Sequence, residues 1–272
     1  MSILEAIVLG IVQGLTEFLP ISSTGHLRVV PAFLGSPDPG AAFTAIVQLG
    51  TMLAVVIYFR HDLVRIALTW ARSLREPALR SQLDARLGWY IIVATIPISI
   101  FGLAFSDQIE TGARSLYLIG SALILLGLLL LLAERVGTLE RGIERVGLRD
   151  GVVVGFAQAL ALVPGVSRSG ATITAGLFLG LDRPTAARFS FLLSVPAVVL
   201  SGLYELRSFA DDPGGSGFAQ LAVATVFAFI FGYASIAFLL RFLQTHTTLV
   251  FVVYRVVLGT AVIVLAAAGA IS

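Results

Sequence analysis

Two short polar segments decide how this chain folds: PISSTG at residues Pro20 to Gly25, and PGVSRSG at residues Pro164 to Gly170. Each interrupts a long apolar stretch, the first at residues 1–36 and the second at residues 151–181. Proline breaks helices, and hydroxyl side chains can satisfy the backbone groups that a break frees. We therefore expect each stretch to form two half-helices joined at its polar segment.

The rest of the chain has the composition of a membrane protein. Of its 272 residues, 57% are hydrophobic and 12% are charged, and the mean hydropathy is +0.97. Stretches long enough to cross a bilayer lie at residues 43–59, 88–105, 115–133, 186–206, 218–240 and 249–271. Broken helices are tolerated at membrane depth where protein or a wet cavity satisfies the freed groups. The sequence predicts an all-α polytopic membrane protein with six transmembrane helices and two re-entrant broken-helix hairpins.

Charge predicts the orientation of these spans. Arginine is concentrated in two stretches, one with Arg60, Arg65, Arg72, Arg75, Arg80 and Arg86, the other with Arg135, Arg141, Arg145 and Arg149. The opposite loops are acidic or neutral, with Asp38, with Asp107 and Glu110 beside Arg114, and with Asp211 and Asp212 after Arg207. Because cytoplasmic loops carry an excess of arginine, we expect the arginine-rich stretches in the cytoplasm and the others in the periplasm. The first hairpin then enters from the periplasm and the second from the cytoplasm.

The chain also contains an internal repeat. Five residues recur 145 positions later: Gly10, Gln13, Leu15, Ser22 and Gly25 as Gly155, Gln158, Leu160, Ser167 and Gly170. A second echo pairs Ala94, Thr95, Ile100, Phe101 and Gly102 with Ala224, Thr225, Ile230, Phe231 and Gly232. We expect residues 1–272 to form one domain of two inverted repeats, 1–135 and 146–272, each a hairpin plus three spans. Such repeats place a site where the broken helices meet.

Polar side chains at the two breaks point to a site for a phosphate or diphosphate. Glu17 and His26 flank the first break, and Arg168 is the only charged residue between Asp150 and Asp182. Ionisable residues at membrane depth mark functional sites by default. Each second half-helix would direct free N–H groups and a positive dipole end into the site, and the arginine fork suits phosphate oxygens.

Three motifs then resemble the undecaprenyl-diphosphate phosphatase family, also called bacitracin-resistance proteins: QGLTE at Gln13 to Glu17, SSTGH at Ser22 to His26, and PGVSRSGAT at Pro164 to Thr172. The resemblance covers nearly the whole chain. It implies an enzyme of the bacterial inner membrane that hydrolyses undecaprenyl diphosphate to the monophosphate in cell-wall lipid recycling. It also implies a pocket open to the periplasm and a divalent cation, Mg²⁺ or Ca²⁺.

The motifs and the breaks together give the expected site residues. The catalytic candidates are Glu17, Ser23, His26 and Arg168. The substrate-binding candidates are Gln13, Ser22, Thr24, Gly165, Ser167, Ser169 and Thr172. Glu17 is the expected metal ligand, with the diphosphate itself completing a Mg²⁺ site. Many relatives carry glutamate where Gln13 stands, so this site has one carboxylate fewer.

The sequence leaves the nucleophile open. Ser23 is favoured by its place near a half-helix N-terminus, but attack by His26 or directly by water fits the same residues. Arg168 would neutralise charge on the transferred phosphoryl group. Arg255, inside the last span, has two readings: a buried residue held by a carbonyl or by Glu205, or a residue that acts near the site.

The composition excludes some kinds of chemistry, and two alternative functions stay open. The chain has no cysteine, and all 18 basic residues are arginine, which excludes thiolate chemistry and phosphate motifs that require lysine. No nucleic-acid partner is expected, whereas membrane lipids are, and a homo-oligomer stays open. A secondary transporter or lipid flippase for a polyprenyl phosphate shares the inverted-repeat architecture and is the main alternative. A combined hydrolase and flippase is a third hypothesis.

Overall fold

The protein is helical throughout the part described by the computed structural model, which comprises residues 1–38, 40–105, 115–211 and 217–271. Within these ranges there is no strand, only one isolated bridge between Arg141 and Leu181. The acidic residues Asp107, Glu110 and Asp212, with Arg114, lie outside the described residues. The prediction of an all-α protein is confirmed.

Each polar segment separates two helices, as the sequence predicts. Helix α1 (Ile3–Phe18) ends just before PISSTG, and α2 (Ser23–Leu34) begins within it. Helix α8 (Leu148–Ala159) and the 3₁₀ turn η3 (Leu160–Leu162) precede PGVSRSG, and α9 (Arg168–Phe178) begins within that segment. The two breaks therefore lie at equivalent places in the sequence repeat.

Seven further α-helices lie within the described residues. They are α3 (Gly40–Tyr58), α4 (Arg60–Ser73), α5 (Leu83–Ala104), α7 (Leu116–Val136), α10 (Arg183–Asp211), α11 (Phe218–Phe242) and α12 (Leu249–Ala267). Two further 3₁₀ turns, η1 (Pro77–Leu79) and η2 (Ile143–Arg145), lie in the arginine-rich connections.

Four of these helices, α5, α7, α11 and α12, are each long and apolar enough to cross a membrane. A fifth span results if α3 and α4, which meet at a bend of 73°, are counted together. The protein is thus a multi-pass membrane protein. Helix α10 covers the expected span at residues 186–206.

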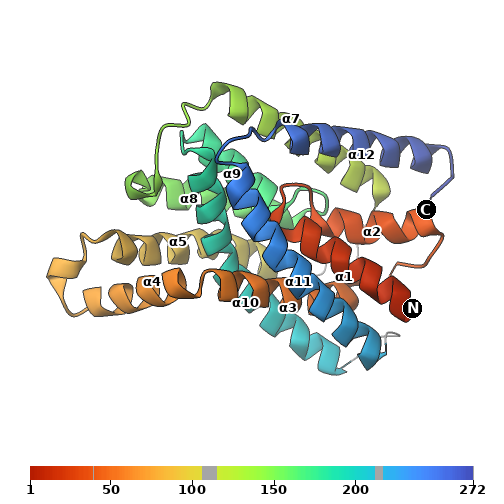
Figure 1. The fold of residues 1–272 in the computed structure, drawn as a ribbon, viewed down its shortest axis with the longest axis horizontal. Coiled ribbons are helices and arrows are strands. Elements are labelled where there is room, and N and C mark those ends of the chain that lie inside the picture. The colour runs from red at the N-terminus through yellow and green to blue at the C-terminus, as the bar shows by residue number, and fades with distance from the viewer. Residues whose placement is uncertain (39, 106–114, 212–216, 272) are drawn as a thin grey trace.

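Each broken pair packs against a long helix of the other half of the chain. Helix α1 lies along α11, α8 lies along α5, and α7 runs beside α12 (Figure 1). Glycine permits the close approach: a Cβ atom on Gly10 would come within 2.9 Å of the Ala224 Cα, and one on Gly155 within 2.6 Å of the Ala94 Cα. In the sequence repeat Gly10 corresponds to Gly155 and Ala224 to Ala94, so the two contacts are equivalent and the same packing occurs twice.

Candidate active site

The two breaks share one backbone conformation. Ser22 and Ser167 have φ angles of 75° and 73°, a region that non-glycine residues rarely adopt. Each serine side chain accepts a hydrogen bond from the backbone N–H three residues later. Ser22 accepts from the Gly25 N–H at 3.4 Å, and Ser167 accepts from the Gly170 N–H at 3.1 Å. Both serines therefore cap the helix that follows them.

The tips of the two broken pairs touch. The Ser169 hydroxyl of the second break donates to the carbonyl of Leu19 in the first break at 3.0 Å. Arg168 forms an ion pair with Glu17, with 3.4 Å between its Nη2 and the carboxylate Oε1. The N-terminal ends of α2 and α9 are thereby brought to one place, where free backbone N–H groups favour an anion.

Glu17 is the centre of the site. Its Oε2 accepts from the Ser23 hydroxyl at 2.6 Å and from the Gln13 amide at 3.0 Å. Its Oε1 accepts from the Gln48 amide at 3.4 Å, on the same side as Arg168. With 8% of its side chain exposed, Glu17 is largely shielded from solvent. Donor groups from α1, α2, α3 and α9 therefore converge on this one carboxylate.

A cavity of about 50 Å³ lies over these groups, lined by Gln13, Glu17, Ser22, Ser23, Thr24, Thr44, Gln48, Ala161, Ser167 and Arg168. Two buried polar atoms among its lining residues have no hydrogen-bond partner: the Arg168 Nη1, a donor, and the Gln13 Oε1, an acceptor. Buried polar atoms are rarely left unpaired. The free guanidinium nitrogen fits a phosphate oxygen, and the free amide oxygen fits a donor or a cation.

The arrangement can carry out nucleophilic phosphoryl chemistry. Ser23 is half-buried, and its hydroxyl already points to a carboxylate that can take its proton. Arg168 stands on the other side of that carboxylate with one N–H group free. A hydroxyl, a carboxylate and a guanidinium, the groups that such chemistry requires, thus line one small polar cavity.

The structure places His26 differently from the sequence expectation. Its Nδ1 lies 2.7 Å from the Ser22 carbonyl, and its Nε2 lies 2.7 Å from the hydroxyl of Tyr254 on α12, with the two rings stacked. Both ring nitrogens therefore already have partners. Because the carbonyl can only accept, Nδ1 carries a proton. His26 therefore links the first break to α12. Its Nε2 could contact a phosphoryl group only if its hydrogen bond to the Tyr254 hydroxyl were broken.

Three expected substrate-binding residues of the second motif have structural contacts. Thr172 bonds the Arg168 carbonyl at 2.8 Å and the Ser190 hydroxyl at 2.6 Å, which ties α9 to α10. Gly165 has a φ of 91°, and a Cβ there would meet the Ile119 carbonyl at 2.6 Å. Ser169 bonds the first break, as described above. These contacts hold the break in place, whereas Ser22, Thr24 and Ser167 line the cavity.

Sequence reasoning missed three residues of the cavity: Thr44 and Gln48 on α3, and Ala161 in η3. They lie outside the three motifs. A signal was present, because Gln48 is an amide inside an apolar stretch, and polar groups at membrane depth are costly unless they have a role.

The protein oxygens fit a Mg²⁺ that is shared with a phosphorylated ligand. Glu17 supplies one carboxylate and Gln13 a free amide oxygen, and Mg²⁺ commonly takes one or two protein oxygens plus substrate phosphates. No group of three or more His, Cys, Asp or Glu side chains that could hold a metal alone occurs among the described residues. Any cation here would therefore depend on the ligand for much of its coordination.

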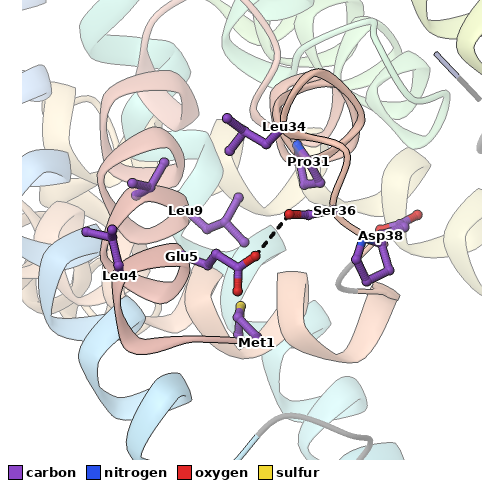
Figure 2. A pocket seen from close by; sticks show the side chains of 10 residues that line it. Met1, Leu4, Glu5, Leu9, Pro31, Leu34, Ser36 and Asp38 are labelled. Atoms are coloured by element: carbon purple, nitrogen blue, oxygen red, sulfur yellow. Dashed lines mark hydrogen bonds between the residues drawn. The ribbon is translucent and has the colours of Figure 1, made fainter. Parts of the chain in front are cut away.

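A larger cavity of about 510 Å³ lies at the open end of the first broken pair (Figure 2). Figure 2 shows Leu4 and Leu9 of α1 on one side and Pro31 and Leu34 of α2 on the other. Its one glutamate, Glu5, is held by the Ser36 hydroxyl at 2.9 Å. This cavity is mainly apolar and lacks the grouped reactive side chains of the smaller one.

The fold and the site define a polytopic helical membrane protein whose polar site lies where two broken helices meet. Residues 6–261 match the family described as bacitracin resistance protein BacA, and the chain belongs to that family.

The chain is also similar over its whole length to proteins named undecaprenyl-diphosphatase. The one from Mycolicibacterium smegmatis is 54% identical over 276 residues, which is 100% of this chain and 99% of the relative. Those from Micrococcus luteus (100% of each chain) and Nocardioides sp. (99% of this chain and 98% of the relative) are 53% and 51% identical.

Proposed function

We propose that this protein is an integral membrane phosphatase that hydrolyses undecaprenyl diphosphate to undecaprenyl phosphate and inorganic phosphate. The observation that carries the proposal is the 2.6 Å hydrogen bond from the Ser23 hydroxyl to Glu17, in a cavity where Arg168 has a free N–H group. The whole-chain similarity to undecaprenyl-diphosphatases supports the same substrate. Such an enzyme regenerates the lipid carrier of peptidoglycan synthesis, and this accounts for bacitracin resistance.

In the first step, the Ser23 oxygen attacks the terminal phosphorus while its proton passes to Glu17. The bond from that phosphorus to the bridging oxygen breaks, and undecaprenyl phosphate leaves with the bridging oxygen. The Arg168 Nη1 and the N–H groups that begin α2 and α9 bind the oxygens on which charge accumulates. The proton held by Glu17 can then be passed to the departing phosphate.

In the second step, water attacks the phosphoserine and restores the enzyme. Glu17 accepts a proton from that water and returns it to the Ser23 oxygen as that oxygen leaves phosphorus. Inorganic phosphate is the second product. One carboxylate thus serves as base for both nucleophiles in turn.

We further propose that Glu17 and the Gln13 Oε1 hold a divalent cation, Mg²⁺ or Ca²⁺, together with the diphosphate. When bound, the cation would neutralise part of the negative charge on the diphosphate oxygens. Gln48 and Arg168, both 3.4 Å from Glu17 Oε1, keep the carboxylate in position for this role.

The placement in the membrane is also proposed. We infer six spans with two re-entrant hairpins in the bacterial inner membrane, in two inverted repeats, with the site open to the periplasm. Support comes from the repeated contacts of Gly10 with Ala224 and of Gly155 with Ala94, and from the matching conformations of Ser22 and Ser167. The arginine-rich segments around α4 and between α7 and α8 fit the cytoplasmic side.

The experiment that tests the function is phosphate release from undecaprenyl diphosphate by the purified wild type in detergent, with Mg²⁺, with Ca²⁺ and with a chelator. We expect release with a cation and little release after chelation. Arg168→Ala should reduce the rate by about 10²- to 10³-fold, the usual cost of losing one group that stabilises developing charge. Folded wild-type protein that releases no phosphate with either cation would contradict the proposal and favour a lipid transporter.

A further inference from the structure

Arg255 is the most deeply buried charged side chain near the site, with 0% of its surface exposed. It lies in α12 and directs its guanidinium between the two breaks. Within the described residues it forms five hydrogen bonds, all to backbone carbonyls. The acceptors are Pro20, Ala122, Leu123, Gly165 and Val166, at 3.0 to 3.3 Å.

Three of these acceptors lie in the two breaks, and the other two, Ala122 and Leu123, lie in α7. The Nη1 group donates to the Pro20 carbonyl of the first break at 3.0 Å. The Nη2 group donates to the carbonyls of Gly165 and Val166 in the second break, each at 3.0 Å. Pro20 lies three residues before Ser23, and Val166 two residues before Arg168. A single planar group therefore joins the two segments that carry the reactive side chains.

Simple stabilisation of the fold does not explain this choice of residue. Burying a cation without a carboxylate partner is costly, and every hydrogen-bond acceptor of Arg255 in the described residues is a neutral carbonyl. Carbonyls freed by a helix break need donors, and arginine supplies five in a fixed plane. The rigid fork sets the spacing of the two breaks in a way that separate donors would not.

We propose that Arg255 is a positioning residue for the phosphatase reaction: by joining the Pro20 carbonyl to those of Gly165 and Val166, it fixes the distance between Ser23 and Arg168. The inference rests on the proposed function. Arg255 bonds the backbone and leaves the side chains of the cavity to the substrate. It therefore acts on the rate of reaction through geometry, since small displacements of reacting groups reduce rates strongly.

Gly170 provides an independent way to disturb this group. A Cβ atom on Gly170 would lie 2.9 Å from the Arg255 Nη1 and 3.1 Å from the Ser167 Cβ. The substitution Gly170→Ala would therefore push the guanidinium away while leaving its charge in place.

The test compares Arg255→Lys, Arg255→Met and Gly170→Ala with the wild type, using undecaprenyl diphosphate. Lysine keeps the charge but cannot bridge both breaks. We expect kcat to fall roughly 10- to 100-fold in all three variants, with KM changed by less than about threefold. Backbone amide exchange should accelerate at residues 21–26 and 165–170 and stay unchanged elsewhere. Arg241→Lys, at an exposed arginine of α11, is the matched control.

Wild-type kcat in Arg255→Lys and Gly170→Ala would overturn the inference, as would a raised KM with unchanged kcat. If both Arg255 variants fail to fold, Gly170→Ala decides: a lowered kcat supports the inference and a wild-type kcat overturns it. A wild type that releases no phosphate would refute the proposed function instead. Amide exchange would then still show whether Arg255 holds the two breaks.

Discussion

At the scale of single residues, the site depends on how many donors meet one carboxylate. Glu17 accepts from Ser23 and Gln13 on one oxygen and from Gln48 on the other, with Arg168 beside it. The loss of this carboxylate would leave Ser23 without a base. General bases typically contribute 10²- to 10⁴-fold to rates.

At the same scale, substitution of His26 tests whether its hydrogen bond to the Ser22 carbonyl supports activity. Its contact with the Ser22 carbonyl can be reproduced by asparagine, whose amide nitrogen takes the place of Nδ1. We expect His26→Asn to be up to about tenfold more active than His26→Ala, the effect of one recovered hydrogen bond. The measurement is kcat for phosphate release by both variants. Equal and complete loss of activity in the two would instead indicate that the imidazole takes part in chemistry.

The residue types of the site could be predicted from sequence, but their contacts could not. A carboxylate, a hydroxyl and an arginine at two breaks of an apolar chain already indicate phosphate chemistry. The direction of His26 toward Tyr254 depends on α12, which is more than 200 residues away in the chain. Gln48 was missed for the same reason, because only the packing of α3 brings it to Glu17.

At the scale of elements, the second broken pair is anchored at its base by an ion pair. Asp150, in the first turn of α8, is 2% exposed and bonds Arg141 through both carboxylate oxygens, at 3.0 and 2.6 Å. Asp150 also accepts the Gly147 N–H at 2.7 Å, and the hydrogen bonds that Arg141 donates to Asp150 raise the pKa of Arg141. Arg141 in turn bonds the Leu179 carbonyl at the end of α9. Both half-helices are thus fastened at one point.

We therefore expect Asp150→Asn to reduce the stability of the protein by about 1.5 to 3 kcal/mol, the range for a lost hydrogen bond to a charged group. The matched control is Asp84→Asn, which breaks the pair of Asp84 with the exposed Arg65. Exposed pairs contribute about 0 to 1 kcal/mol. Thermal unfolding in detergent measures both variants. A similar small shift for the two would show that the base of α8 is not an anchor.

Helix breaks were predictable at the scale of elements, and the angles between helices were less so. Proline, glycine and serine indicated the positions of both breaks, because these residues act through local backbone geometry. The bend of 73° between α3 and α4 falls at the end of the span predicted at residues 43–59. Its angle is set by packing against neighbouring helices, which the local sequence does not report.

At the scale of the whole molecule, the broken helix pair of each half of the chain packs against the other half. Gly10 of α1 meets Ala224 of α11, and Gly155 of α8 meets Ala94 of α5. The repeat spacing in the sequence anticipated which residues correspond, but not that each pair would pack on the opposite half. Under the proposed inverted topology, this packing brings the N-terminal ends of α2 and α9 together from opposite sides of the membrane.

The inverted topology can be tested directly because the chain has no cysteine. We expect Ser36→Cys to react with a membrane-impermeant maleimide in intact cells, and Arg75→Cys and Gly142→Cys to react only after the membrane is opened. These positions lie in the proposed periplasmic and cytoplasmic segments. Labelling of Arg75→Cys in intact cells, with Ser36→Cys protected, would reverse the orientation and contradict a site open to the periplasm.

The central claim is that Ser23, activated by Glu17, performs the hydrolysis. The most direct measurement is kcat for phosphate release from undecaprenyl diphosphate by Ser23→Ala, compared with the wild type and with Ser121→Ala at an exposed position of α7. The account predicts a fall of at least roughly 100-fold for Ser23→Ala, as for other lost nucleophiles, and no change for the control. A Ser23→Ala enzyme that keeps the wild-type rate would contradict it.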